Sequence, residues 1–124
     1  MKRFNDEDKR HHHIRAYQLW IILIGLAKRR ETITYKSLAE LIDIGVEIAL
    51  GEPLKHLARW CKQNELPGLT VLVVKENQGV PGDWLELEDF DKERELVFNT
   101  NWYLMVPPTP EELQAAFNNF GQVR

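Results

Sequence analysis

The chain of 124 residues contains one cysteine and no long apolar run. A single cysteine cannot form an internal disulfide, and sparse cysteine is typical of a reducing compartment. The longest apolar stretch, residues 19–27, is about half of the ~20 residues that cross a bilayer. No small-residue cleavage site follows the charged N-terminus, so no signal peptide is expected. These absences predict a bacterial-type cytoplasmic protein with no membrane segment.

Motifs of catalysis are missing as well. The sequence has no phosphate-cradling glycine loop, nucleophile elbow or HExxH pattern. Cys61 falls on the inward stripe of a predicted helix, where a thiol acts as a small apolar group. The run His11–His13 consists of adjacent side chains, which cannot all converge on one ion in regular structure. We therefore expect no enzymatic activity, cofactor, metal site or small-molecule substrate.

Charge is distributed unevenly along the chain, although the net charge is only −3. Residues 1–30 hold eight Lys or Arg and three acids, whereas residues 76–124 hold ten acids and three bases. Local basic surface is what a nucleic-acid binder needs, and an acidic half can attract a basic protein. The charge pattern alone leaves both kinds of partner open.

The order of the predicted elements indicates a fold. We expect residues 1–13 to be a disordered polar arm and residues 14–124 to form a single domain. Apolar periodicity and β-propensity predict helices at 16–29, 37–42 and 51–64, an extended step at 32–35, and strands at 69–75 and 83–87. This order is that of a winged helix-turn-helix. The predicted class is α+β, with three helices plus a β-hairpin wing.

Residues 89–124 are predicted to form a C-terminal cap on this domain. A charged helix at 91–98 and a strand at 102–106 come first. A second helix then starts clearly: Thr109 stands at the N-cap, Pro110 at the first helical position, and Glu112 where it can reach back to the cap.

The third predicted helix carries the candidate DNA contacts. Lys55, Arg59 and Lys62 recur at steps of four and three residues, so they form one basic ridge. In helix-turn-helix proteins the second helix of the motif lies in the major groove and presents such side chains. His56 and Gln63 flank the ridge. The alternative is an ordinary solvated helix face.

Part of the chain resembles a known family of DNA-binding domains. The segments Ile33–Tyr35, Leu38–Ala39 and Ala49–Gly51, with Leu54, resemble the corresponding domain of the alkylguanine-DNA alkyltransferases and the alkyltransferase-like proteins, over about residues 16–75. A longer pattern is also similar to small bacterial proteins with no assigned activity. In the alkyltransferase family this domain is a winged helix, and the resemblance implies that Tyr35 helps to rotate a target nucleotide.

Two departures from the family limit what the resemblance implies. The intercalating arginine of the family would fall at or near Ile48. The reactive Pro-Cys-His-Arg motif would fall within residues 70–74, where this chain has neither cysteine nor histidine. Alkyl transfer is therefore excluded.

Two functional hypotheses follow from the sequence. The first is a non-enzymatic protein that binds duplex DNA through the third helix, with Tyr35 and Lys36 at the DNA backbone. Its site residues are Tyr35, Lys36, Lys55, His56, Arg59, Lys62 and Gln63. The second is a protein-interaction module, such as an adaptor or a toxin-immunity protein, that uses the acidic C-terminal half to bind its partner.

Overall fold

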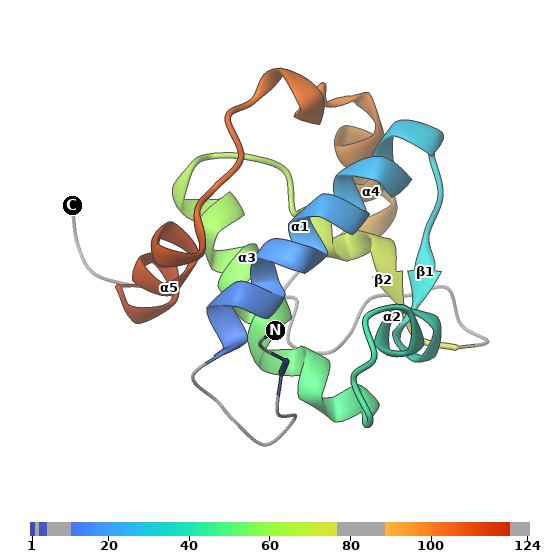
Figure 1. Ribbon diagram of the computed structural model, residues 1–124. Coiled ribbons are helices and arrows are strands. Elements are labelled where there is room, and N and C mark those ends of the chain that lie inside the picture. Colours follow the sequence, from blue (N-terminus) through green and yellow to red (C-terminus); the bar gives the residue numbers. More distant parts are fainter. Residues whose placement is uncertain (2, 5–10, 77–88, 120–124) are drawn as a thin grey trace.

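The computed structural model describes residues 1, 3–4, 11–76 and 89–119. Its described part is α-rich (Figure 1). The α-helices are α1 (His12–Arg29), α2 (Tyr35–Leu41), α3 (Gly51–Gln63), α4 (Phe90–Asn99) and α5 (Pro110–Asn118). Single 3-10 turns are η2 (Glu47–Leu50), η3 (Leu69–Leu72) and η4 (Trp102–Leu104), and the strands are β1 (Ile33–Thr34) and β2 (Val73–Val74). The predicted α+β winged helix-turn-helix is therefore wrong.

The first strand of the predicted wing has a different structure from the one expected. Residues 69–72 form the 3-10 turn η3, and only Val73 and Val74 are extended. They pair in parallel with β1, in the register Ile33 to Val73 and Thr34 to Val74, and among the described residues they have no antiparallel partner. A hairpin strand with one wet face should alternate apolar and polar residues, whereas residues 69–74 are all buried. The predicted partner strand, 83–87, lies outside the described residues.

Helix α1 is the centre of the domain, as its almost continuous apolar sequence predicts. Its buried side chains include Leu19, Trp20 and Leu23, and it packs against both α3 and α5. The helix begins at His12, before the predicted domain start at residue 14. It ends at Arg29, and the left-handed backbone of the capping residue Arg30 (φ 58°) turns the chain toward β1. Lys28 and Arg29 in its last turn suit the negative end of the helix dipole.

Helix α2 begins directly after β1. The Thr34 hydroxyl accepts a hydrogen bond from the Ser37 backbone N–H at 3.1 Å and so caps the helix. The predicted extended step at 32–35 is thus shorter than expected, because Tyr35 is already helical. The turn after α2 leads through η2 into α3, as Figure 1 shows.

The C-terminal part differs from the prediction in one element. Residues 102–104 form the turn η4 rather than a strand, because Trp102 turns inward and its indole N–H donates to the Val97 carbonyl at 2.9 Å. The helix start at Thr109 is confirmed: Thr109 and Glu112 form a reciprocal capping box. Trp20 packs edge-on against both Trp60 and Trp102, with ring centroids 5.4 and 5.7 Å apart. In the described part of the chain, no helix is long and apolar enough to span a membrane.

Candidate nucleic-acid interface

The predicted groove-facing ridge of α3 is largely covered by α5. His56 is only 1% exposed, and its ring stacks on Phe117 with centroids 4.0 Å apart. Its Nδ1 lies 2.7 Å from the Glu52 carbonyl oxygen, one turn back along α3. Burial lowers the pKa of the His56 imidazole below its ordinary value, so the ring is neutral at pH 7. The prediction that His56 faces a DNA groove is therefore wrong.

Arg59 and Gln63 are also used inside the molecule. The Arg59 guanidinium donates to the Phe117 carbonyl at 3.1 Å and lies over the Phe117 ring. The Gln63 side-chain amide donates to the Ala116 carbonyl at 3.0 Å. The last carbonyls of a helix have no partner within it, so these two side chains satisfy the end of α5. Periodicity marked them as polar but could not tell a solvent-facing stripe from one that caps another helix.

Lys55 and Lys62 remain at the surface of α3. The Lys55 side chain is 39% exposed, and its Nζ lies 3.8 Å from a Glu52 carboxylate oxygen, a geometry that contributes little stability. Lys62 is exposed near the end of the helix. The ridge therefore survives as two separate lysines, without the Arg59 and His56 that were predicted to join them.

Tyr35 and Lys36 lie elsewhere, at a hollow of about 360 Å³ where α2 and α3 begin. Tyr35 is half-buried and Lys36 is exposed. We call this space the lysine-rimmed hollow; its lining residues are Tyr35, Lys36, Glu47, Ile48, Gly51, Lys75 and Glu76. The structure thus brings two of the seven predicted residues together with the first turn of α3, one turn from Lys55.

Ile48 is the residue that the sequence prediction did not place in the site. Its side chain is 88% exposed at the edge of the hollow. Two further aliphatic residues close to it in sequence, Leu41 and Val46, are also exposed. The resemblance to the alkyltransferases contained the only sequence indication, because it aligned Ile48 with an intercalating side chain. Aliphatic side chains can serve that purpose, since several DNA-binding proteins insert Leu, Ile or Met between base steps.

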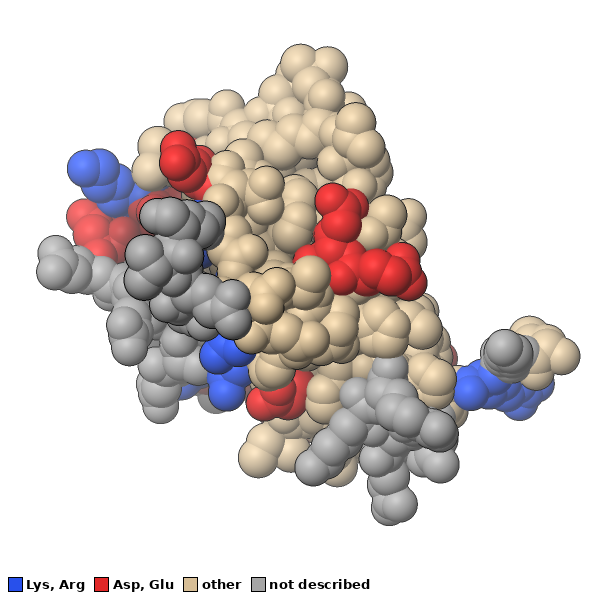
Figure 2. Space-filling view, turned by 90° about the vertical axis from the view of Figure 1, so that its left-hand side faces the viewer, with Lys and Arg blue, Asp and Glu red and all other residues tan. Residues whose placement is uncertain are grey.

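Charge near the hollow is balanced. Lys36 and Lys75 line it together with Glu47 and Glu76. On the face shown in Figure 2, Lys and Arg side chains lie at separate places, and a wide upper area carries neither sign. With two lysines and two glutamates lining the hollow, DNA bound there would have few phosphates neutralised by the protein.

No catalytic group stands out in the described residues. Cys61 is fully buried, and burial raises its pKa to about 12, so the thiol is neither ionised nor reachable. Among the described His, Cys, Asp and Glu side chains, no group of three could hold a metal ion. The absence of enzyme activity and cofactors remains a prediction.

Comparison with known proteins gives no relative. No protein-family model, curated protein or solved structure matches the chain. The alkyltransferase resemblance and the DNA-binding hypothesis therefore stay predictions.

Proposed function

We propose that the protein is a non-enzymatic DNA-binding protein whose contact surface is the lysine-rimmed hollow with Lys55 beside it. One observation carries the proposal: Ile48 is 88% exposed at the edge of a hollow lined by Tyr35, Lys36 and Lys75. Arg59 and Gln63, which the sequence favoured on α3, have no part in it, because both donate hydrogen bonds to carbonyls of α5.

The chemistry of this surface suits a duplex. Lysine ammonium groups bind phosphates as point charges, and an aliphatic wedge can enter a base step that bends open. The hollow is at the lower end of the ~300–1,000 Å³ range of ligand pockets, so it has room for a flat ring. The resemblance adds that the residue at Tyr35 acts on a target nucleotide. These features support binding of bent or locally opened DNA rather than sequence reading through a groove-filling helix.

The phosphate contacts can be tested by a charge-matched pair of variants. We expect the triple variant K36A/K55A/K75A to bind a random duplex more weakly and with a salt dependence reduced by about 2 to 3 in log–log slope. The measurement is fluorescence anisotropy of a labelled duplex between low and physiological salt. The control, K28A/R29A/K92A, loses the same charge at exposed positions away from the hollow. Equal binding by both variants would contradict the proposal.

The wedge can be tested separately. Ile48→Ala removes an exposed side chain, so it should leave the free energy of unfolding within about 0.5 kcal/mol. We expect it to weaken binding and to abolish the fluorescence rise of a duplex carrying 2-aminopurine, which reports unstacking. Leu104→Ala, an equally exposed aliphatic elsewhere, is the matched control. An unchanged 2-aminopurine response in Ile48→Ala would rule out Ile48 as a wedge.

Protein binding is the second candidate function, and a different observation favours it. Residues 100–110 contain no charged side chain, and Leu104 and Val106 are 82% and 88% exposed. Figure 1 places this segment at the top of the molecule, the level of the uncharged area in Figure 2. The acidic C-terminal half has fewer carboxylates available for a partner than the sequence indicated. The Glu93 carboxylate accepts a hydrogen bond from the Gly68 backbone N–H, and Glu95 forms an ion pair with Arg30.

A pull-down under low-salt conditions tests this second candidate. The parent protein should recover one stoichiometric protein partner, and L104D/V106D should lose it while keeping its affinity for duplex DNA. Recovery of nucleic acid alone by both proteins would exclude the protein-binding function.

A further inference from the structure

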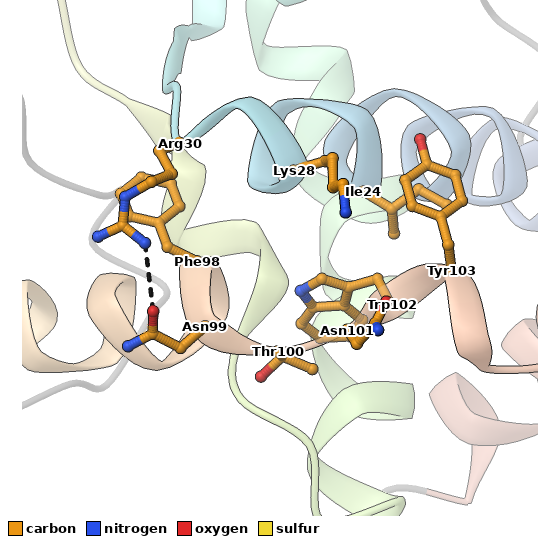
Figure 3. A pocket seen from close by; sticks show the side chains of 9 residues that line it. All are labelled: Ile24, Lys28, Arg30, Phe98, Asn99, Thr100, Asn101, Trp102 and Tyr103. Atoms are coloured by element: carbon orange, nitrogen blue, oxygen red, sulfur yellow. Dashed lines mark hydrogen bonds between the residues drawn. The ribbon is translucent and has the colours of Figure 1, made fainter.

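A second hollow, of about 280 Å³, lies between the end of α1 and the turn η4 (Figure 3). It shares no lining residue with the lysine-rimmed hollow. Its walls come from the last turns of α1, from the end of α4 and from the segment that follows α4. The lining residues are Ile24, Lys28, Arg30, Phe98, Asn99, Thr100, Asn101, Trp102 and Tyr103.

The charged residues that line this hollow are all basic. Two of its lining residues, Lys28 and Arg30, are basic, and none is acidic. Arg30 is already held, because its guanidinium pairs with Glu95 and donates to the Asn99 side-chain oxygen. Lys28 has no carboxylate partner among the described residues. Figure 3 shows its ammonium on the side of the hollow that faces Trp102 and Asn101. The hollow therefore offers one uncompensated cation beside an amide.

Besides its basic, amide and hydroxyl side chains, the hollow is lined by one aliphatic and three aromatic residues, Ile24, Phe98, Trp102 and Tyr103. Trp102 is fixed by its hydrogen bond to Val97 and is only 2% exposed, so it is a rigid part of the hollow but offers little surface of its own. The Tyr103 side chain lies against α1 at Gly25, where its hydroxyl oxygen is 3.5 Å from the position of an added Cβ. Leu104 and Val106 follow at once in the sequence and are exposed. An anion that enters the hollow thus has the exposed aromatic ring of Tyr103 beside it.

We propose that this hollow binds a single carboxylate that lies next to an aliphatic side chain, as in the end of a peptide chain or in an acidic residue beside leucine. One unpaired ammonium suits one negative charge, and the exposed ring of Tyr103 can cover an adjoining alkyl group. The idea that this hollow recognises a protein partner rests on the second candidate function. Binding of a small carboxylate in the hollow can be tested independently of that function.

The probes are N-acetyl-L-leucine, its amide N-acetyl-L-leucinamide, and acetyl-Leu-Glu-amide, titrated into the ¹⁵N-labelled protein. The readouts are the Trp102 indole and Asn101 side-chain amide resonances, with the Trp60 indole as an internal reference. We expect N-acetyl-L-leucine to shift the first pair selectively and the amide to shift neither. Stronger shifts by the dipeptide would assign the site to acidic side chains rather than to chain ends. Equal shifts by acid and amide would overturn the proposal.

Two variants locate the charge. Lys28→Met keeps the apolar stem and should weaken binding of N-acetyl-L-leucine up to about fivefold, the range of an exposed ion pair. Lys92→Met, an exposed lysine of α4 outside the hollow, should leave binding unchanged. A Lys28→Met variant that binds as tightly as the parent would also overturn the proposal. The pull-down reports separately on the protein partner, so the site and the second candidate function can fail independently.

Discussion

The rings of His56 and Phe117 stack face to face, with an interplanar angle of 12° and centroids 4.0 Å apart. The Arg59 guanidinium carbon lies 4.4 Å from the centroid of the same phenylalanine ring. Phe117 is thus held by two residues of α3, one aromatic and one cationic, near the end of α5. This contact explains why polar residues of α3 are turned toward another helix instead of toward water.

Replacement of Phe117 should loosen α5. We expect Phe117→Ala to lower the free energy of unfolding by about 2 kcal/mol, less than for a fully buried ring, because the side chain is half-buried. Urea unfolding followed by circular dichroism measures the change. Ala115→Gly, at an exposed position of the same helix, should cost only about 1 kcal/mol. A smaller loss for Phe117→Ala than for this control would show that the stack does not hold α5.

The buried His56 should make stability depend on pH. Burial lowers its pKa in the folded protein, whereas the unfolded chain keeps the ordinary value of 6.5. The hydrogen bond to the Glu52 carbonyl acts in the opposite direction but is smaller, and the nearby His12 lowers the pKa further. The unfolded state therefore binds more protons below pH 6.5.

The free energy of unfolding should accordingly fall as the pH drops from 6.5 toward the folded pKa, and this loss should stop below it. His56→Phe keeps an aromatic ring on Phe117 but cannot titrate. Urea unfolding at several pH values should give a shallower slope for this variant than for the parent. Parallel curves would assign the pH dependence to other groups.

Cys61 should resist modification in the native protein. Its pKa of about 12 and its full burial leave almost no accessible thiolate. Reaction with a disulfide reagent at pH 8 should be about a hundredfold or more slower in the native protein than in denaturant. The chain contains no other cysteine, so the absorbance change reports on this residue alone. Rapid stoichiometric labelling under native conditions would show that α3 opens readily.

The capping box at the start of α5 can be tested by a threonine pair. Thr109→Ala removes the hydroxyl that accepts from the Glu112 N–H at 3.1 Å, and should cost about 1 kcal/mol. Thr32→Ala, at an exposed position before β1, should change the free energy of unfolding by less than about 0.5 kcal/mol. Denaturant midpoints compare the two, and equal midpoints would argue against the cap.

Structure in this chain could be predicted where it depends on residues close together in the sequence. The Thr109–Glu112 box and the apolar periodicity of α1 could both be predicted, since they depend on spacing within a few residues. The nearly continuous apolar sequence of residues 69–75 predicts one strand, but such a run is compatible with any fully buried backbone. Only the distant Ile33 and Thr34 determine that Val73 and Val74 pair in parallel.

The candidate site shows the same limit. Tyr35 and Lys36 were identified, but their position next to Lys75 depends on the β1–β2 pairing, across about a third of the chain. Arg59 and Gln63 were identified as polar, yet their hydrogen-bond partners are carbonyls of α5, which no spacing in α3 reveals. Ile48 was the opposite case, because hydrophobic character alone predicts burial, whereas the structure exposes it.

The two-residue sheet has a consequence for the order of folding. Pairing of Thr34 with Val74 closes a loop that contains α2, η2 and α3. Closing a loop of this length costs about 3 kcal/mol of chain entropy. The hydrogen bonds of two residues of parallel strand do not offset this cost. The pairing should therefore form only after α1 and α3 have docked, and its amides should gain hydrogen-exchange protection late. The lysine-rimmed hollow, which depends on that pairing, is then among the last features of the domain to appear.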